Sequence, residues 1–494
     1  MNFYTNVYYT GSTILLRQMS GARAEKVRIN FSPSLFLLSS KNTNFKTVDG
    51  RNVDEITFLN VHEMNEFKKT YENVQNFEIH GDIGVEYQYI SKEFGTEGEY
   101  DFDKISVMYI DIETTCEGGF PNINDPQEKI IAITCNHKSK KYVFCLGNFI
   151  WEDQNTIVKC YDDEQYLLRE FIDFMEEQQP DVLSGWNIRF FDLPYLINRC
   201  KKILDDNEIK RISPWGIIKD KIVNKGGIDR LVFDIVGIST LDYYELYKTF
   251  TYINQESYKL DHIAYVELGE RKVSYDEYES LSDFYKNNFQ KFVEYNMKDV
   301  ELVERLEEKL RLMELAIALA YSAGVNYMDV FSQVRTWDVI IYNYLKKNGT
   351  IIPPKIKSVK DEQYAGAYVK EPIVGMHDWI ISYDVNSLYP SLIIHYNISP
   401  ETLITKNFKG KIDIKDILTK NKNSETFKCF DIAKELNCSI AANGTMYSNE
   451  RRGFLPELMD KMYKERKDYK DKMIEAKKKL EKIDEELKRR GLKV

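Results

Sequence analysis

The feature that most constrains this chain is a pair of acids, Asp111 and Glu113, in and just after the apolar run of residues 105–112. Such a run predicts a buried strand. Side chains alternate along a strand, so both acids point to one face while Ile110 and Ile112 point to the other. Two buried like charges repel, and a bound divalent metal resolves that conflict. The alternative is an exposed strand face with two solvated acids.

The surrounding pattern alternates strands with helices. Residues 130–135 and 141–146 are further candidate strands, 163–178 have helical spacing, and 182–187 predict a strand and turn before a helix near Asp192. This alternation predicts an α/β domain around a mixed sheet. Two apolar runs flanking Asn224–Gly227 predict a β-hairpin, and residues 281–325 form a long helical stretch.

The two ends of the chain differ from this middle part. Residues 1–100 predict a β-rich accessory region, Ile351-Ile-Pro-Pro marks a boundary, and Trp379–Val385 predicts a buried strand. From Pro456, one helix of about 35 residues is expected to end near Gly491. Its apolar positions recur every three or four residues, with only Arg466 breaking the register, at Met459, Met462, Tyr469, Met473, Ala476, Leu480, Ile483 and Leu487.

Composition excludes several classes. The 494 residues suffice for about three domains. No run of about 18 apolar residues predicts a membrane span, and no secretory signal is expected. Seven cysteines without a C-x-x-C pair suggest neither a disulfide framework nor a zinc site, which fits a reducing cytosol. The net charge of −10 argues against a passive nucleic-acid coat, though not against an enzyme with a local basic groove.

Two later segments carry further acids. Asp192 follows Asn187-Ile-Arg-Phe-Phe, where it can simply cap a helix. Asp299 follows Tyr295 by four residues, so the two share one helix face, which by itself is an ordinary pairing. The order of the three segments is more specific than any one of them: D-x-E on a strand, then N-x-x-x-F-D, then Y-x-x-x-D.

In that order the segments resemble the tyrosine-bearing branch of the DEDD exonucleases, as found in B-family DNA polymerases. The resemblance implies that Asp111, Glu113, Asp192 and Asp299 hold two metal ions and that Tyr295 orients the attacking water. Two ions about 4 Å apart can serve both ends of an in-line displacement at phosphorus. A set of four carboxylates without histidine favours Mg²⁺ or Mn²⁺ over Zn²⁺.

Residues beside Asp192 are candidate DNA contacts. Phe190 and Phe191 can stack on an unpaired terminal base, and Asn187 can hydrogen-bond the strand; core packing is the alternative for both rings. By resemblance, the hairpin around Gly226 and Gly227 is similar to the wedge that separates primer from template, and a plain surface hairpin is the alternative.

A second constellation resembles the first polymerase motif of the B family. It reads Asp384-Val-Asn-Ser-Leu-Tyr-Pro-Ser, and Tyr364-Ala-Gly366 upstream resembles the family segment that tracks the template. The runs near Leu241, Asn397 and Ala442 are similar to T-even-type bacteriophage enzymes. The resemblance implies metal ligation by Asp384 and the Val385 carbonyl, and contacts to a dNTP from Ser387, Leu388, Tyr389, Arg466, Lys467 and Lys470. The alternatives are a helix cap at Asp384 and a solvated helix face.

The resemblance also implies a fold class, an α/β multidomain protein. Its parts would be a β-rich N-terminal domain (1–100, completed by about 312–355) and an RNase H-like 3′→5′ exonuclease domain (101–311). A partial α+β palm (356–455) and a first fingers helix (456–494) would follow.

Two family motifs do not occur: K-x-x-x-N-S-x-Y-G after residue 456, and D-T-D-S anywhere. We therefore expect no polymerisation by this chain alone, because the sequence is either truncated or one chain of a split polymerase. In the split case, Met473, Leu480, Ile483 and Leu487 would pack against a C-terminal polymerase chain; a homodimeric coiled coil is the alternative.

The expected partners are primer-template and single-stranded DNA, that second chain, and, by resemblance, a sliding clamp and other replisome proteins in the cytoplasm of a phage-infected bacterial cell. A free-standing exonuclease with a vestigial polymerase segment is the second hypothesis. A non-catalytic RNA-binding regulator that uses the N-terminal region is the third, and the intact carboxylates argue against it as the sole role.

Overall fold

The computed structural model describes residues 2–96, 98–355, 369–404, 412–441 and 443–491. The chain divides into two compact units, Met1–Leu38 with Asp54–Asn343, and Ser39–Val53 with Tyr344–Val494. Among the described helices, none has the length and apolar character needed to cross a bilayer.

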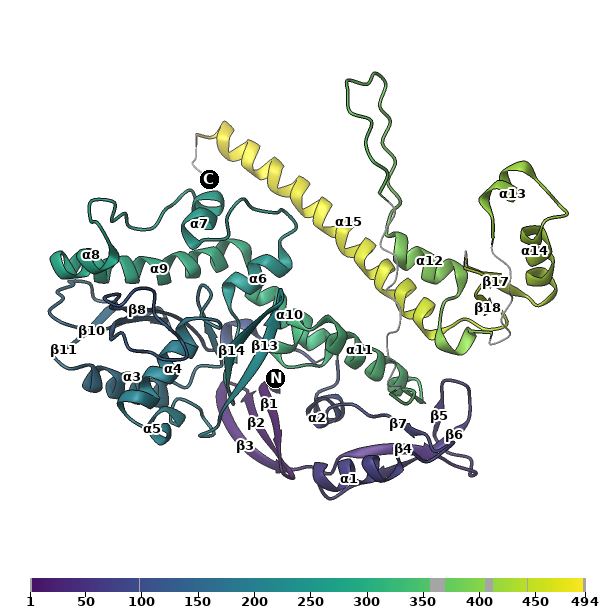
Figure 1. The fold of residues 1–494 in the computed structure, drawn as a ribbon, viewed down its shortest axis with the longest axis horizontal. Helices are drawn as coiled ribbons and strands as arrows, with labels where there is room; N and C mark the ends of the chain where they lie inside the picture. Colours follow the sequence, from purple (N-terminus) through teal and green to yellow (C-terminus); the bar gives the residue numbers. More distant parts are fainter. Residues whose placement is uncertain (1, 97, 356–368, 405–411, 442, 492–494) are drawn as a thin grey trace. The chain divides into compact units, whose positions relative to one another are not determined.

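A six-stranded mixed sheet forms the centre of the first unit, in the order β11-β10-β9-β8-β12-β15 (Figure 1). Strand β9 runs antiparallel to β8 and β10, whereas β10–β11, β8–β12 and β12–β15 are parallel pairs. The predicted α/β arrangement is confirmed. The strands are β8 (Val107–Thr114), β9 (Ile130–His137), β10 (Lys140–Leu146), β11 (Thr156–Tyr161), β12 (Val182–Ser184) and β15 (Ser239–Thr240).

Helices cover both faces of this sheet (Figure 1). Met108, Ile110 and Ile112 of β8 lie in one buried apolar cluster with residues of α3 (Glu164–Gln178) and α4 (Asp192–Ile203). On the other face, alternate residues of β10 pack against Val293 and Met297 of α9 (Phe289–Leu310). The acids of β8 therefore face α9.

The N-terminal part is rich in strands, as predicted. Strands β1 (Asn2–Thr10), β2 (Thr13–Ser20) and β3 (Arg23–Asn30) form an antiparallel sheet. Gly11 and Gly21 have φ of 63° and 64° in its two tight turns, a conformation that favours glycine. After them come β4 (Ser34–Leu38), paired with β7 (Ile79–His80), and the helices α1 (Val61–Tyr71) and α2 (Val85–Glu93).

A buried ion pair fixes the loop that follows β8. Arg199 of α4 donates to both carboxylate oxygens of Glu164, at 2.8 and 2.6 Å. Its Nη1 also donates to the carbonyl oxygens of Pro126 and Gln127. Both charged side chains are 6% exposed. The guanidinium therefore holds the end of loop 115–129 against the helical layer.

Replacing Arg199 with alanine should lower the free energy of unfolding by about 3–5 kcal/mol, because Glu164 would remain buried and unpaired. Urea denaturation followed by circular dichroism measures this. Lys202 makes an exposed ion pair with Asp125 of the same loop, so Lys202→Ala is a matched control that should change stability little. Equal losses in the two variants would contradict the assignment.

The predicted hairpin is confirmed. Strands β13 (Ile218–Lys225) and β14 (Ile228–Ile235) pair antiparallel along their full length, with Gly226 and Gly227 at positive φ in the turn. The helical stretch expected over 281–325 is broken at Asn288 and Arg311. The remaining described helices of this unit are η1 (Phe102–Lys104), α5 (Asp206–Lys210), α6 (Tyr243–Phe250), α7 (Leu260–Leu268), α8 (Leu281–Asn287), α10 (Leu312–Ala323), η2 (Tyr327–Phe331) and α11 (Gln333–Lys347), which continues into the second unit.

In the second unit, short elements precede one long helix. α15 (Phe454–Arg489) has 36 residues, which confirms the predicted terminal helix. Its first turn is fixed by Asn397 and Glu401, whose side chains accept from the N–H groups of Gly453 and Phe454. Other elements here are β5 (Phe45–Thr47), β6 (Asn52–Thr57, shared with the first unit), β16 (Thr350–Ile351), α12 (Leu388–Tyr396), η3 (Pro400–Thr402), α13 (Ile414–Thr419), α14 (Glu425–Glu435), β17 (Cys438–Ile440) and β18 (Met446–Ser448).

The buried strand predicted at Trp379–Val385 is wrong. The segment is irregular, and Trp379, Ile381 and Tyr383 are exposed. A strand needs a neighbour for its backbone groups, and no described strand pairs with this one. The apolar pattern therefore identified a segment suited to a sheet, but the described residues supply no sheet for it.

Candidate active site

Strand β8 presents Asp111 and Glu113 toward α9. Asp111 lies directly opposite Thr134 of β9 and Glu113 opposite Ala132. Both acids are half-buried. Alternation along the strand places the apolar Ile110 and Ile112 in the core below, as expected from the sequence.

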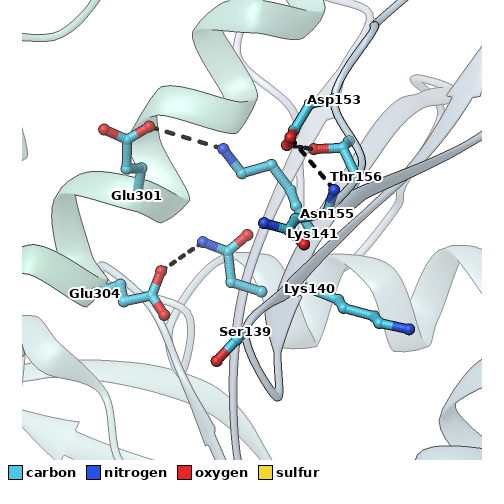
Figure 2. A pocket seen from close by; sticks show the side chains of 9 residues that line it. Ser139, Lys140, Lys141, Asp153, Asn155, Thr156, Glu301 and Glu304 are labelled. Atoms are coloured by element: carbon cyan, nitrogen blue, oxygen red, sulfur yellow. Dashed lines mark hydrogen bonds and ion pairs between the residues drawn. The ribbon is translucent and has the colours of Figure 1, made fainter.

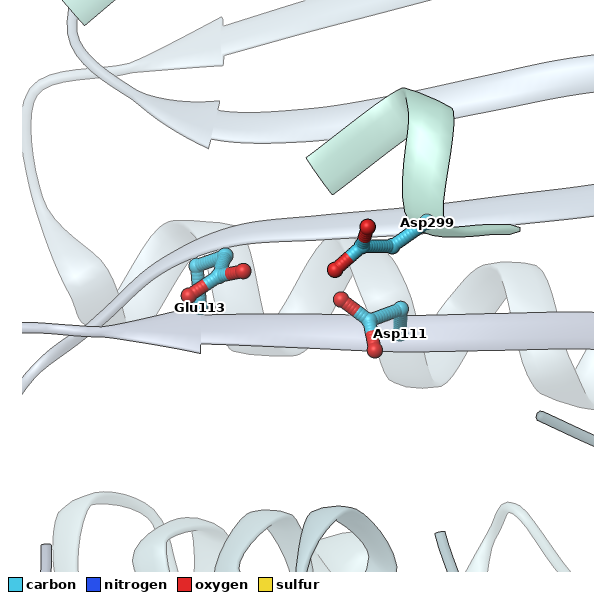
Figure 3. A group of neighbouring side chains, drawn as sticks. All are labelled: Asp111, Glu113 and Asp299. Carbon is cyan, nitrogen blue, oxygen red and sulfur yellow. The ribbon is translucent and has the colours of Figure 1, made fainter. Parts of the chain in front are cut away.

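Helix α9 adds a third carboxylate, that of Asp299 (Figure 3). One oxygen from each of Asp111, Glu113 and Asp299 lies within 4.8 Å of the others. In the part of the chain that the structure describes, no other group of three His, Cys, Asp or Glu side chains meets this criterion. The strand pair and the helix residue, predicted separately, therefore converge.

Asp192 lies at the first residue of α4, next to β8. Its Oδ1 accepts a hydrogen bond of 3.2 Å from the N–H of Ile112, between the two strand acids. The side chain is buried. It is not part of the three-carboxylate group, but it is close enough for its charge to raise the pKa of Asp111.

The turn that precedes Asp192 is held by Asp242, which is not among the predicted site residues. Asp242 is fully buried and accepts from the N–H groups of Asn187 (2.9 Å) and Arg189 (3.0 Å). Asn187 has φ of 65°. Gly185 lies so close to β8 that an added Cβ would stand 2.4 Å from the Ile110 carbonyl oxygen. The backbone of this turn is therefore tightly specified.

Lys272 and Asn296 also contact the acids, although neither is a predicted site residue. The Lys272 ammonium donates to the Tyr295 hydroxyl at 2.9 Å and forms an ion pair with Asp299. Asn296 donates from Nδ2 to Asp111 Oδ2 at 2.7 Å. Lys272 comes from the loop between α7 and α8, where no spacing pattern marked it, whereas Asn296 is adjacent to Tyr295 and its helical position was available.

Crowding of acids shifts their proton affinities. Burial, with neighbouring negative charge, raises the pKa of Glu113 to about 8 and that of Asp111 well above its usual range. Burial also raises the pKa of Asp192 to about 7 and that of Asp299 to about 6, the latter opposed by Lys272. The metal-free site therefore retains protons near neutrality, as expected where a cation is needed to balance the charge.

These shifts predict a pH-dependent stability. Between about pH 4 and 8 the folded, metal-free site binds more protons than the unfolded chain, so stability falls as pH rises. Mg²⁺ should displace those protons, and its stabilising effect should grow over the same range. We expect the rise in Tm on adding Mg²⁺ to EDTA-treated protein to be larger at about pH 8 than at about pH 5.5.

Differential scanning fluorimetry measures this effect. The charge-neutral variant Asp111→Asn/Glu113→Gln should respond to Mg²⁺ by a smaller amount that depends little on pH. A wild-type response that is equal at both pH values would remove the proton-displacement explanation.

The donor set fits a hard divalent cation. All the converging ligands are carboxylate oxygens, which Mg²⁺ and Mn²⁺ prefer. In addition, Oδ1 of the buried Asp299 receives no hydrogen bond from the described residues. A buried carboxylate oxygen without a donor is suited to metal coordination.

An aromatic pair includes the residue that precedes Asp192. Phe191, the residue before Asp192, is half-buried and contacts Phe120, with ring centroids 5.4 Å apart. Phe120 is 87% exposed, and the sequence analysis did not select it. Phe190, in contrast, is buried, which agrees with the core-packing alternative for that ring.

Basic side chains of the hairpin β13–β14 contact the Phe190 ring. Lys225 and Arg230 are placed over the Phe190 ring, at 4.9 and 5.2 Å from its centroid, and Arg189 at 5.6 Å. Glu245 pairs with Arg189 and Lys225. Three cations therefore gather over the Phe190 ring, and Glu245 pairs with two of them.

A separate cavity of about 160 Å³ lies between the β9–β10 turn, the start of β11 and α9 (Figure 2). Asn136 donates to Glu304 at 2.8 Å, and Lys141 pairs with Glu301 at 3.7 Å. Both of its glutamates thus have polar partners, and the cavity contains none of the predicted site residues.

The second predicted constellation lies on exposed parts of the second unit, around α12 and on α15, two helices that pack against each other. Asp384 and Val385 precede α12, whose N-cap is Ser387, and Leu388 and Tyr389 begin that helix with exposed side chains. Arg466, Lys467 and Lys470 are exposed on α15. Tyr364 and Gly366 lie outside the described residues.

Comparisons with known proteins find matches in both halves of the chain. The sequence profile described as "DNA polymerase family B, exonuclease domain" matches residues 49–263, and that of "DNA polymerase family B" matches residues 331–494. The chain is 32% identical to the DNA-directed DNA polymerase of Escherichia phage RB69, over all of this chain and 56% of that protein.

More distant relatives extend the pattern. The DNA-directed DNA polymerase of Enterobacteria phage T4 is 30% identical over 96% of this chain and 54% of its own length. The DNA polymerase delta catalytic subunit of Drosophila melanogaster is 28% identical over 63% of this chain and 28% of its own length. The chain thus spans just over half the length of the phage proteins it matches.

Proposed function

Because the chain belongs to DNA polymerase family B, we propose that it removes nucleotides from single-stranded 3′ ends of DNA and carries the first part of a polymerase site. The observation that supports the exonuclease most is the convergence of Asp111, Glu113 and Asp299 within 4.8 Å. Two of these acids fall inside the stretch that matches the exonuclease profile.

In this proposal residues 101–311 form an RNase H-like exonuclease domain beside an N-terminal domain of residues 1–100 completed by about 312–355. Residues 356–455 are a partial palm and 456–494 a fingers helix. The mixed sheet with helices on both faces supports the first assignment, and the 36-residue α15 supports the last.

The acids would hold Mg²⁺ or Mn²⁺, with Asp192 as the fourth ligand. Bound metal would supply an activated water and stabilise the leaving 3′-oxygen. The protein's own groups act around it. Burial and the Asp299 charge raise the pKa of Tyr295, so its hydroxyl keeps a proton at neutral pH and can donate to the attacking water. Lys272 holds that hydroxyl in place and offsets the acids.

Single-stranded DNA is the substrate that the surroundings favour. The exposed Phe120 and the half-buried Phe191 form a surface on which an unpaired terminal base can stack. Asn187, Lys225 and Arg230 would contact the strand, with the two cations suited to phosphates. The hairpin β13–β14 would then separate the terminal base from its template.

A degradation assay tests the exonuclease. A 5′-labelled single strand incubated with the purified 494-residue chain and Mg²⁺ should be shortened from its 3′ end with release of nucleoside 5′-monophosphates. EDTA should stop the reaction, and Mg²⁺ should restore it. Digestion that persists in EDTA, or that starts from the 5′ end, would exclude the proposal.

The polymerase half rests on Asp384 and the groups after it. In the proposal, Asp384 and the Val385 carbonyl bind metal, the N–H groups of Ser387 and Leu388 meet the triphosphate, and Tyr389 packs under the dNTP sugar. Arg466, Lys467 and Lys470 would reach the phosphates, and Tyr364 and Gly366 the template. One aspartate cannot place two metals, so the missing motifs must come from further polypeptide, on the same chain or on a second one.

The second candidate is an exonuclease that does not contribute to synthesis. It is favoured by the irregular, exposed segment at Trp379–Val385, where a polymerase site needs an ordered strand. The two candidates differ in one outcome, primer extension after the missing motifs are supplied.

A further inference from the structure

Two cysteines fifteen residues apart meet at the edge of the central sheet. Strands β10 and β11 are parallel, and Cys145 is the register partner of Cys160. Their Sγ atoms are 3.5 Å apart. Cys145 is buried, whereas Cys160, on the edge strand, is exposed. The fifteen-residue spacing of the two cysteines matches no C-x-x-C motif, and the strand register brings them together.

The backbone geometry suits a covalent bond. Neighbouring strands lie about 4.8 Å apart, within the Cα separation of about 4.4–6.8 Å that disulfides span. The sulfurs need to approach by about 1.5 Å to reach a bonded distance near 2.05 Å. In the proposal below, rotation about the two Cα–Cβ bonds would supply that approach.

We propose that Cys145 and Cys160 are a redox-modification site that forms an intramolecular disulfide when the protein meets a peroxide. The exposed Cys160 attacks hydrogen peroxide, giving a sulfenic acid and one water. Cys145 then attacks that sulfur, forming the S–S bond and releasing the second water. Each thiol loses one proton and one electron, and the peroxide is reduced to two waters.

The position of the pair gives the bond a structural effect. Cys145 packs with Val293 and Met297 of α9, the helix that carries Tyr295 and Asp299. The disulfide would fasten the edge strand β11 to β10 beneath that helix. It would also protect Cys160 from irreversible oxidation, because the partner thiol is already in contact.

Peptide mapping of the full chain tests this. After hydrogen peroxide, catalase and alkylation of the remaining thiols, trypsin should release Tyr142–Lys159 joined to Cys160–Arg169, about 2 Da lighter than the two reduced peptides together. Two of the seven thiols should be lost, and dithiothreitol should restore both.

Variants separate this pair from other thiols. Cys160→Ser should abolish the linked peptides, whereas Cys116→Ser, which removes a half-exposed thiol elsewhere in the same unit, should leave them unchanged. Two results would overturn the proposal. One is linkage of Cys160 to any other cysteine. The other is conversion of Cys160 to a sulfinic acid while Cys145 remains a free thiol that the alkylating reagent captures.

Discussion

Replacing both Asp111 and Glu113 with alanine will lower the rate of single-stranded DNA digestion by about 10³-fold or more, since loss of a single preorganised charge stabiliser typically costs 10²–10³. The two side chains come from one strand, and each has a carboxylate oxygen within 4.8 Å of one from Asp299. Without them only Asp192 and Asp299 of the four proposed ligands remain, too few to hold a metal pair. Single-turnover rates at saturating enzyme measure the effect on the chemical step.

The control for this variant is Glu152→Ala with Asp162→Ala, which removes two exposed acids from the same unit. It changes the net charge equally and should digest DNA at the wild-type rate. The site variant should stay folded, because removing mutually repelling buried acids relieves a cost. Undiminished digestion by the folded site variant would refute the metal-site assignment.

Primer extension will be absent with the 494-residue chain alone and will appear when the missing motifs are supplied as a second polypeptide or as a continuation of this one. The physical reason is the metal count. Nucleotidyl transfer through two ions needs carboxylates from two positions, and the sequence carries only Asp384 of the expected set. The change is therefore between no detectable product and full-length product.

The variant Asp384→Ala gives this experiment its specificity. In the complemented mixture it should abolish extension while leaving single-strand digestion at the wild-type rate. Asp378→Ala, which removes a nearby acid outside the motif, should leave both reactions unchanged. Complementation without any extension would favour the second candidate, an exonuclease with no part in synthesis.

The sequence anticipated local structure where one segment carried its own signal. Alternation fixed which side of β8 would hold the acids, the two glycines fixed the turn of β13–β14, and heptad-like spacing defined α15. These are decisions between neighbouring residues, and they depend on periods and turn chemistry that any folded context preserves.

Trp379–Val385 shows where such signals stop. Its apolar residues fit a buried strand, but a strand exists only when another supplies hydrogen bonds and a covering face. No described residues do so, and the segment stays irregular. Domain boundaries near 101, 312, 356 and 456 stay predictions for a related reason, since they depend on contacts that no local pattern contains.

What the sequence determined by itself was therefore the set of acids, their strand and helix positions, and the family they indicate. Only the tertiary structure decided which distant groups join them: Lys272 against Tyr295 and Asp299, Asp242 under the turn before Asp192, and Phe120 beside Phe191. Periodicity reports the face on which a side chain lies. The partner that it meets there depends on how helices and loops far apart in the chain pack on the same sheet.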